Sequence, residues 1–191
     1  MLHLNKIIII SGSSGSGKTT LVNYLMLHSE FNLTFSVSAC SRQKRPLEID
    51  GKNYFFLSVD EFKEKINNDH FLEWEEVYKD HFYGTLKSST MSILHSGKNI
   101  LFDVDVKGAR SIKAYFKDQA LSIFIKAPTV SIARDRLMQR ATESAREINF
   151  RINKIQDEIV IGQQMDYQLI NDDLTDSKDE IKCVVKNFLD V

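Results

Sequence analysis

The sequence predicts an α/β fold, in which helices cover both faces of a parallel sheet core. Four short apolar runs are typical of strands buried on both faces, at 7–10, 99–104, 121–125 and 167–170. Apolar residues at helical spacing lie between or after these runs, at 18–28, 87–94, 109–116, 130–140, 147–161 and 176–188. Strands that alternate with helices in this way indicate parallel βαβ units.

The first of these units is the most sharply defined. Residues 7–10 are four consecutive isoleucines, a β-branched run that suits a strand buried on both faces. A glycine-rich turn follows, and Leu21, Val22, Leu25 and Met26 then recur at helical spacing. Strand, loop and helix in this order open a βαβ unit.

Two segments depart from the alternation. The stretch 33–83 is rich in aromatic residues and has several short strand-like pieces around Asp50-Gly51, a strong turn signal. It predicts an insertion on the sheet core. The stretch 139–150 is polar and contains several arginines, and it predicts a mobile cap.

Composition bounds the class of protein. A chain of 191 residues suits one compact domain, 1–191, and its formal net charge of −1 gives no general basic field for a nucleic-acid partner. No apolar run approaches ~20 residues and no signal peptide precedes residue 7, so we expect a cytoplasmic protein with no membrane partner. Cys40 and Cys183 are expected to be reduced, and the histidines show no metal-ligand pattern.

A phosphate-binding loop lies between the first strand and the first helix. The run Gly12-Ser-Ser-Gly-Ser-Gly17-Lys18-Thr19 fits the pattern GxxxxGK[ST], and its strand–helix context predicts a P-loop NTPase-type core. Backbone N–H groups and the helix N-terminus would cradle phosphates, with Lys18 on the β- and γ-phosphates and Thr19 on Mg²⁺. The predicted ATP-binding residues here are Gly12, Ser13, Ser14, Gly15, Ser16, Gly17, Lys18 and Thr19.

Asp103 follows a buried strand and resembles a Walker B acid. A carboxylate at the carboxyl end of a parallel strand faces the ligand crevice, where it could hold Mg²⁺ through water. The alternative is a solvated aspartate at a strand end.

Other P-loop families fit the sequence less well. Asp105-Val-Lys-Gly108 fits the DxxG of a GTPase, but the guanine-binding motif NKxD is incomplete, because Asn153-Lys-Ile-Gln156 lacks its aspartate. Segments typical of adenylate kinases and shikimate kinases are absent as well.

Much of the chain closely resembles guanylate kinases. The matching segments are Ser36-Val-Ser-Ala-Cys-Ser-Arg42, Arg45-Pro46, Asp50-Gly-Lys-Asn-Tyr54-Phe-Phe, Phe71-Leu-Glu73-Trp74, Tyr83-Gly84-Thr85, Asp103-Val-Asp105 and Gly108-Ala-Arg110. Arg140-Ala-Thr-Glu-Ser144 resembles the lid of the family, and Asn171-Asp-Asp-Leu174 resembles its late adenine-side loop. The resemblance implies transfer of the γ-phosphoryl group of ATP to GMP, with Mg²⁺ as cofactor and dGMP as a further substrate.

The resemblance also implies three parts. A core at about 1–34, 90–126 and 157–191 would hold ATP, a small mixed insertion at about 35–89 would bind GMP, and a helical lid at about 127–156 would close over both. In the lid, Arg140 and Arg151 match family arginines, and Arg134 or Arg136 could share their role. A solvated helix face is the alternative for any one of these arginines. By resemblance alone, Asn171 would lie near adenine.

The predicted GMP-binding residues fit the chemistry of that ligand. Guanidinium groups and phenol hydroxyls suit its dianionic phosphate, and a carboxylate suits the donor edge of guanine. The phosphate residues are Arg42, Arg45, Tyr54 and Tyr83, and the base residues are Ser38, Glu73, Thr85 and Asp105. A basic surface turn is the alternative for the two arginines. Trp74 beside Glu73 is expected to pack in the core.

Three positions depart from the family pattern: Ala141 replaces a glycine, Ser13 a proline and Phe82 a tyrosine. Two rival functions stay open on the sequence. Guanylate-kinase-like domains of scaffold proteins bind phosphorylated partners, but they usually lack a working phosphate loop. A related kinase with another small substrate is the second rival, and Ser38, Glu73 and Thr85 argue against it. A homo-oligomer also stays open.

Overall fold

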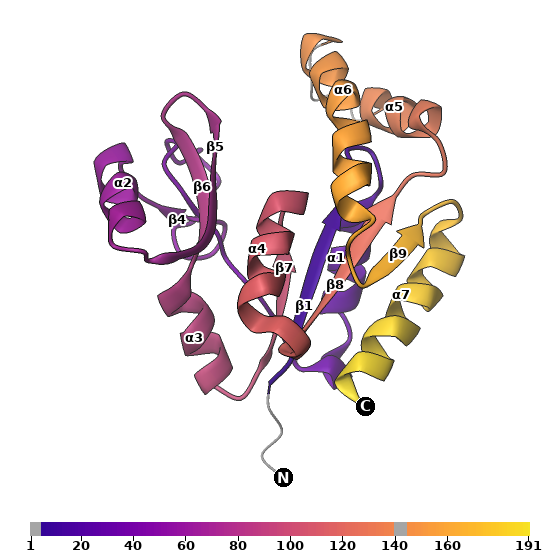
Figure 1. Cartoon of the computed structure of the whole chain (residues 1–191), viewed down its shortest axis with the longest axis horizontal. Coiled ribbons are helices and arrows are strands. Elements are labelled where there is room, and N and C mark those ends of the chain that lie inside the picture. The colour runs from indigo at the N-terminus through magenta and orange to yellow at the C-terminus, as the bar shows by residue number, and fades with distance from the viewer. Residues whose placement is uncertain (1–4, 140–144) are drawn as a thin grey trace.

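The main sheet is five-stranded and entirely parallel. The computed structural model describes residues 5–139 and 145–191. Its strands run in the order β2 (Leu33–Phe35), β7 (Asn99–Asp103), β1 (Ile7–Gly12), β8 (Ala120–Lys126) and β9 (Tyr167–Ile170). The prediction of a parallel sheet with helices on both faces is therefore confirmed, and Figure 1 shows the arrangement.

Alternate isoleucines of β1 face opposite sides of this sheet. Ile8 and Ile10 join a core built with α1 (Lys18–Met26) and α7 (Leu174–Leu189). Ile7 and Ile9 join the opposite core, which α3 (Lys87–His95) and α4 (Val106–Phe116) cover. All four isoleucines are fully buried, because a central parallel strand is covered on both of its faces.

A second, mixed sheet lies to one side of the first. Its order is β4 (Phe55–Phe56), β3 (Ala39–Cys40), β6 (His81–Leu86) and β5 (Phe71–Tyr78), with β3–β4 parallel and the other pairs antiparallel. Helix α2 (Val59–Asn67) covers it, with Phe62 stacked on Phe71 at 4.4 Å between ring centroids. This sheet is the expected small mixed insertion, although its exact bounds stay a prediction.

Two elements differ from the sequence analysis. Helix α2 lies where only short strand-like pieces were expected, and β2, at the start of the aromatic-rich stretch 33–83, belongs to the main sheet. A capping box begins α2: the Ser58 side chain accepts from the Glu61 N–H, and the Glu61 carboxylate accepts from the Ser58 N–H. This S-x-x-E pattern is visible in the sequence and starts the helix.

The prediction that Trp74 packs in the core is wrong. Its side chain is 47% exposed, although its ring lies 6.2 Å from that of Phe82. The reason is its place on β5, the edge strand of the second sheet, where β6 is its only neighbouring strand among the described residues.

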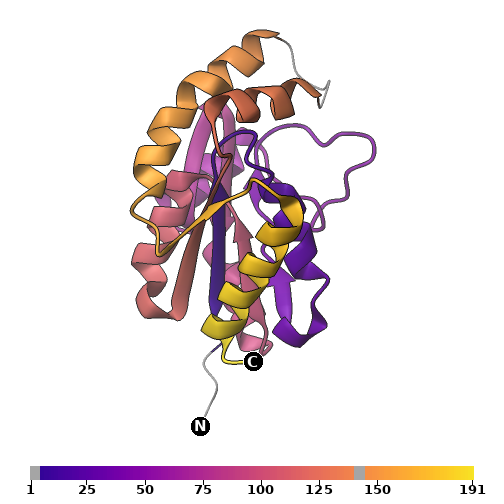
Figure 2. The same cartoon turned by 90° about the vertical axis from the view of Figure 1, so that its right-hand side faces the viewer.

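The remaining helices lie above the carboxyl edge of the main sheet. Helices α5 (Val130–Gln139) and α6 (Ala145–Gly162) rise on one side of this edge, and the second sheet rises on the other (Figures 1 and 2). Two short 3₁₀ turns, Ser29–Phe31 and Lys117–Gln119, complete the fold. Across 5–139 and 145–191, no helix is both long and apolar enough to cross a membrane.

Candidate active site

The phosphate loop connects β1 to α1 at the carboxyl edge of the main sheet. Gly15 and Gly17 both have left-handed backbone conformations, with φ of 76° and 84°, which glycine adopts without strain. A side chain at Gly15 would also collide with the Ala133 carbonyl of α5. The loop starts with a hydrogen bond from the Ser13 N–H to the Ile125 carbonyl at 3.0 Å. Strand β8 and helix α5 therefore fix the shape of this loop.

Asn171 lies directly beneath the phosphate loop. Its side-chain amide donates to the Ser16 carbonyl at 2.7 Å, and its buried Oδ1 has no hydrogen-bond partner within residues 5–139 and 145–191. A cavity of about 330 Å³ opens beside it. The residues that line this cavity are Gly15, Gly17, Thr20, Arg136, Gln139, Asn171 and Leu174. Asn171 therefore lies beside the phosphate loop, a position compatible with its predicted place near the adenine of ATP.

Lys18 begins helix α1 and reaches across to β7. Its ammonium group forms an ion pair with the carboxylate of Asp103, the last residue of that strand. Thr19, the next residue, is exposed at the mouth of the loop. The Thr19 hydroxyl and the Asp103 carboxylate are hard oxygen donors of the type that Mg²⁺ binds, so the residues present fit this ion.

A second cavity, of about 210 Å³, lies between β5, β6 and the carboxyl end of β7. Its lining contains four carboxylates and two phenols. The lining residues are Ser38, Tyr54, Glu73, Glu75, Val77, Tyr83, Gly84, Asp103, Val104 and Asp105. Six of the eight predicted GMP residues therefore line or face it, namely Ser38, Tyr54, Glu73, Tyr83, Asp105 and, through its bond to Glu73, Thr85.

Glu73 is the most perturbed carboxylate of this cavity. Burial raises its pKa from an ordinary 4.5 to about 7, although the Thr85 hydroxyl donates to its Oε1 at 2.6 Å. Gly108 leaves room for this carboxylate, because a Cβ there would lie 3.0 Å from Oε2. A half-buried acceptor whose charge is costly favours a ligand that offers donors.

Asp105 has a structural role besides its place in the cavity wall. Its carboxylate caps helix α4 by accepting from the Gly108 N–H at 2.7 Å. A hydrogen bond between the side chains of Asp105 and Glu75 raises the pKa of Glu75. The Glu75 carboxylate also lies 3.4 Å from the Lys107 ammonium group. Glu75 was not predicted from the sequence, although it follows Glu73 by two residues and so shares its side of strand β5.

Arg42 lies at the edge of this cavity, packed on aromatic rings. Its guanidinium carbon is 4.9 Å from the centroid of the Tyr54 ring. Glu48 pairs with it through two hydrogen bonds, at 2.7 Å and 2.5 Å, and this pairing lowers the pKa of Glu48 to about 2. Glu48 also accepts from the backbone N–H of Arg45, whose side chain is exposed. Sequence reasoning missed Glu48, although it lies only three residues after Arg45.

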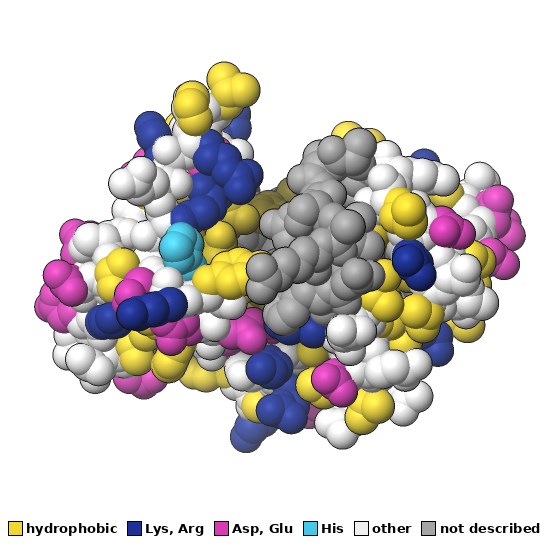
Figure 3. All heavy atoms as spheres, turned by 90° about the horizontal axis from the view of Figure 1, so that it is seen from above, with side chains coloured by type: hydrophobic (Ala, Val, Ile, Leu, Met, Phe, Trp, Pro, Cys, Tyr) yellow, Lys and Arg dark blue, Asp and Glu magenta, His cyan; other side chains and the backbone are white. Residues whose placement is uncertain are grey.

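Among the arginines expected in the lid, Arg134 is exposed on α5, and Arg136 donates to the carbonyl oxygens of Asn171 and Asp172 at 2.9 and 3.3 Å. Arg151 is exposed on α6. Arg140 and Ala141 lie outside the described residues. Seen from above, Lys and Arg side chains gather on the projecting part of the insertion side (Figure 3).

These features define a class of protein: a P-loop phosphotransferase with a second, acid-lined cavity beside its phosphate loop. Comparison with known proteins narrows the class. The family model described as guanylate kinase matches residues 4–188. A guanylate kinase of Porphyromonas gingivalis is 45% identical over 97% of this chain and 99% of its own length. One of Bacteroides fragilis is 47% identical over 97% of this chain and 91% of its own length.

A solved structure agrees with this match. The crystal structure of guanylate kinase from Anaplasma phagocytophilum superposes with a TM-score of 0.71 at 25% identity, covering 97% of this chain and 86% of that one. The chain belongs to the guanylate kinase family.

Proposed function

We propose that this chain transfers the γ-phosphoryl group of ATP to GMP, giving ADP and GDP. One observation carries the proposal beyond the family match. Asp103 pairs with Lys18 of the phosphate loop and at the same time lines the acidic cavity. A nucleoside triphosphate would bind in the loop, and a nucleotide with a donor-rich base would bind in the cavity. Their phosphate groups would therefore meet near Asp103, and direct transfer requires this proximity.

The acceptor side is assigned by the chemistry of its residues. Glu73 accepts from the N1–H and exocyclic amine of guanine, while hydroxyls of Ser38 and Thr85 suit its other edge. Asp105 assists at the base, and Arg42, Arg45, Tyr54 and Tyr83 bind the phosphate. dGMP keeps all of these groups, so we expect it to be a substrate as well.

The donor side uses the phosphate loop. Backbone N–H groups of residues 12–19 hold the triphosphate, Lys18 neutralises its β- and γ-phosphates, and Asn171 lies on the adenine side. Thr19 and Asp103 would hold Mg²⁺, Asp103 through water, and the ion would supply positive charge to the phosphates of ATP. We assign the insertion at about 35–89 to GMP and the lid at about 127–156 to closure over both nucleotides.

Transfer then needs no covalent intermediate and no general base, because the attacking phosphate oxygen of GMP is already anionic. Lys18 and the lid arginines Arg140 and Arg151 stabilise the charge that develops on the transferring group. Closure of the lid excludes water and so suppresses hydrolysis of ATP. A cytoplasmic location stays a prediction.

Product analysis tests this function. Incubation of the purified chain with ATP, GMP and Mg²⁺ should yield GDP and ADP in a 1:1 ratio, as measured by ³¹P NMR. The same mixture without GMP should give almost no ADP. A folded protein that binds GMP without forming GDP would instead be a binding module, and the proposal would fail.

Arg42→Ala should raise KM for GMP by about 100-fold and change KM for ATP by less than about twofold. A guanidinium contact to a phosphate dianion is worth roughly 2–3 kcal/mol, and only the acceptor side loses it. Arg42→Lys should rescue only in part, because an ammonium lacks the planar fork. Initial rates across both substrates give the two constants.

Lys44→Ala is the matched control, since Lys44 is exposed in the same turn and has no assigned role. Equal losses in KM for ATP and GMP in Arg42→Ala would place Arg42 outside the GMP site.

A further inference from the structure

A single carboxylate joins helix α6 to the phosphate loop. Glu158 lies in the C-terminal half of α6, and its Oε2 accepts a hydrogen bond from the Ser14 N–H at 3.1 Å. The two residues are 144 positions apart in sequence, and the acceptor belongs to a helix that begins inside the proposed lid and ends beyond it. None of the roles assigned above uses Glu158.

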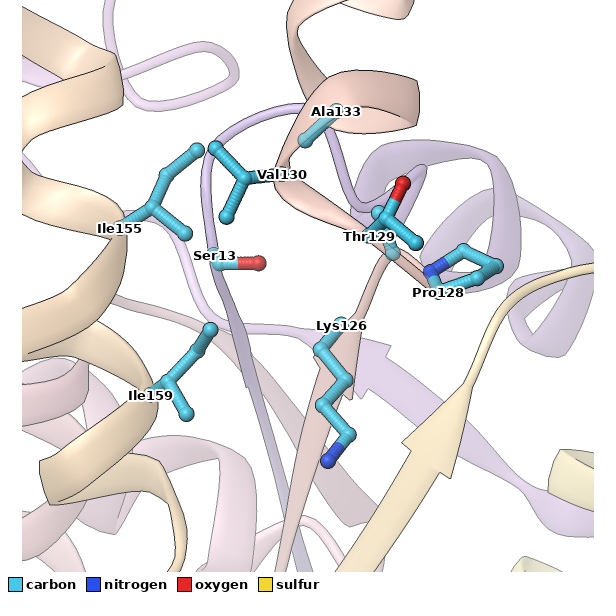
Figure 4. Close-up of a pocket in the computed structure, with 9 residues that line it drawn as sticks. Ser13, Lys126, Pro128, Thr129, Val130, Ala133, Ile155 and Ile159 are labelled. Atoms are coloured by element: carbon cyan, nitrogen blue, oxygen red, sulfur yellow. The ribbon is translucent and has the colours of Figure 1, made fainter.

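The surroundings of this contact are otherwise apolar. Ile155 and Ile159, on either side of Glu158 along α6, pack against Ala127 and Ala133 in a small core of their own. A cavity of about 190 Å³ separates them from Ser13 of the loop, and Figure 4 shows both isoleucines directed toward it. An incompletely filled interface positions the loop weakly, so the polar bond to Ser14 supplies the directional contact here.

The far end of α6 is fixed to the main sheet. Gly162, its last residue, lies so close to Phe124 of β8 that a Cβ there would approach the ring to 2.5 Å. Arg151 lies seven residues before Glu158, two helical turns away and therefore on the same side of α6. A rigid helix anchored at Gly162 thus connects the position of Arg151 to that of the Glu158 carboxylate.

We propose that Glu158 is a positioning residue that couples helix α6, and with it Arg151, to the phosphate loop. The inference rests on the proposed phosphoryl transfer. When the lid moves, α6 tilts about its anchored end at Gly162 and displaces the Glu158 acceptor, and the Ser14 N–H either follows or loses its partner. Glu158 therefore brings the loop into its transfer geometry when Arg151 reaches the phosphoryl group, and it touches neither substrate.

The charges around Glu158 act on its pKa in both directions. Burial raises the pKa of Glu158, the Ser14 N–H lowers it, Lys154 and Arg151 on α6 lower it, and Asp105 at the start of α4 raises it. A charged acceptor makes the stronger hydrogen bond, so a neutral amide at this position should replace it only in part.

Glu158→Ala tests the proposal with two readouts. In steady-state kinetics, kcat should fall about 10-fold and KM for ATP should rise, while KM for GMP stays within about twofold, because a hydrogen bond to a charged group is lost only at the loop. In the ligand-free protein, backbone amides of 12–17 should exchange hydrogen faster. Glu158→Gln should recover about half of each effect on a logarithmic scale.

Asp157→Ala is the matched control, because Asp157 is exposed on the neighbouring position of the same helix. Equal kinetics and exchange in the two alanine variants would overturn the proposal. Tighter ATP binding in Glu158→Ala would overturn it too, since the carboxylate would then be a competitor of phosphate.

If Glu158→Ala does not fold, Glu158→Gln is tested by the same two readouts. Hydrogen exchange does not depend on the reaction. A wild-type protein that forms no GDP would therefore refute the proposed function, while the loop measurement would still decide the role of Glu158.

Discussion

Lys18→Ala is expected to lower kcat by about 10³-fold, the size of effect seen when a fixed electrostatic partner is removed from a developing charge. Lys18 is the cation of the phosphate loop, and its ammonium group already lies against Asp103, which lines the acidic cavity. Without it, the negative charge of the transferring group faces the Asp103 carboxylate unscreened by any side chain of the loop. The change is measured as GDP formation at saturating ATP and GMP.

The fold should survive this substitution. Helix α1 is held by buried Leu21, Val22 and Leu25, and the Lys18 side chain is 24% exposed and contributes nothing to that core. Thermal melting by circular dichroism checks this point. Lys98→Ala is the control, because Lys98 is exposed just before β7, at the opposite end of that strand from Asp103. Near-normal turnover in a folded Lys18→Ala protein would remove Lys18 from the reaction.

Glu73→Gln is expected to abolish most of the preference for guanine over adenine. An ionised carboxylate only accepts hydrogen bonds, so it pairs with the N1–H and amine of guanine and opposes the bare N1 of adenine. Sites built on such buried pairs discriminate by roughly 10⁴-fold. The amide can turn a donor toward adenine, so kcat/KM for GMP should fall sharply and the GMP/AMP ratio should fall by about 100-fold or more.

The raised pKa of Glu73 adds a pH dependence to this prediction. Because its pKa in the free protein is about 7, kcat/KM for GMP should fall about tenfold per pH unit as the pH drops below 7. The glutamine that replaces Glu73 in the variant does not titrate, so the profile of Glu73→Gln should be flat over the same range. Glu76→Gln, on the exposed part of β5, is the control and should keep the wild-type profile. An unchanged GMP/AMP ratio in Glu73→Gln would move base recognition to other groups.

The same pKa shift predicts a change in stability. The folded protein holds the Glu73 proton up to about pH 7, whereas an unfolded chain releases it near 4.5. Folded Glu73 therefore becomes destabilising as the pH rises from about 4.5 to 7, and Glu73→Gln should be more stable than wild type at pH 8, by up to about 3 kcal/mol.

Urea denaturation at pH 8 and pH 4.5 measures this difference. It should vanish at the lower pH, where Glu73 is largely protonated in the folded state and the unfolded chain is near its own pKa. A variant that is less stable than wild type at pH 8 would show that burial does not raise this pKa.

The main sheet could be predicted because its signals are local. The isoleucines of β1 are buried on both faces, so every residue of the run is apolar, and the glycine pattern that follows is specific to a strand–loop–helix turn. The same holds for β7, β8 and β9, whose bounds fall within two residues of the expected ones. Helix α2 was missed because aromatic residues dominate its surroundings, although the Ser58–Glu61 capping box marks its start.

Parts of the candidate site depend on contacts that no local pattern reveals. The pairing of Arg42 with Glu48 is set by how the turn 42–48 folds back, and the contact of Glu158 with Ser14 joins residues from opposite halves of the chain. The exposure of Trp74 follows from the edge position of β5, which becomes known only once the strand order is known. Motifs identify which residues belong together, while the sheet order decides what surrounds them.

The ratio of kcat/KM for GMP to that for AMP in the wild-type protein is the most direct test of this account. A coupled assay of ADP production, with ATP and Mg²⁺ held saturating, gives both constants. The half-buried Glu73–Thr85 pair and the acidic cavity beside Lys18 predict that GMP is preferred by about 10⁴-fold. Comparable constants for the two nucleotides, or no ADP with GMP, would contradict it.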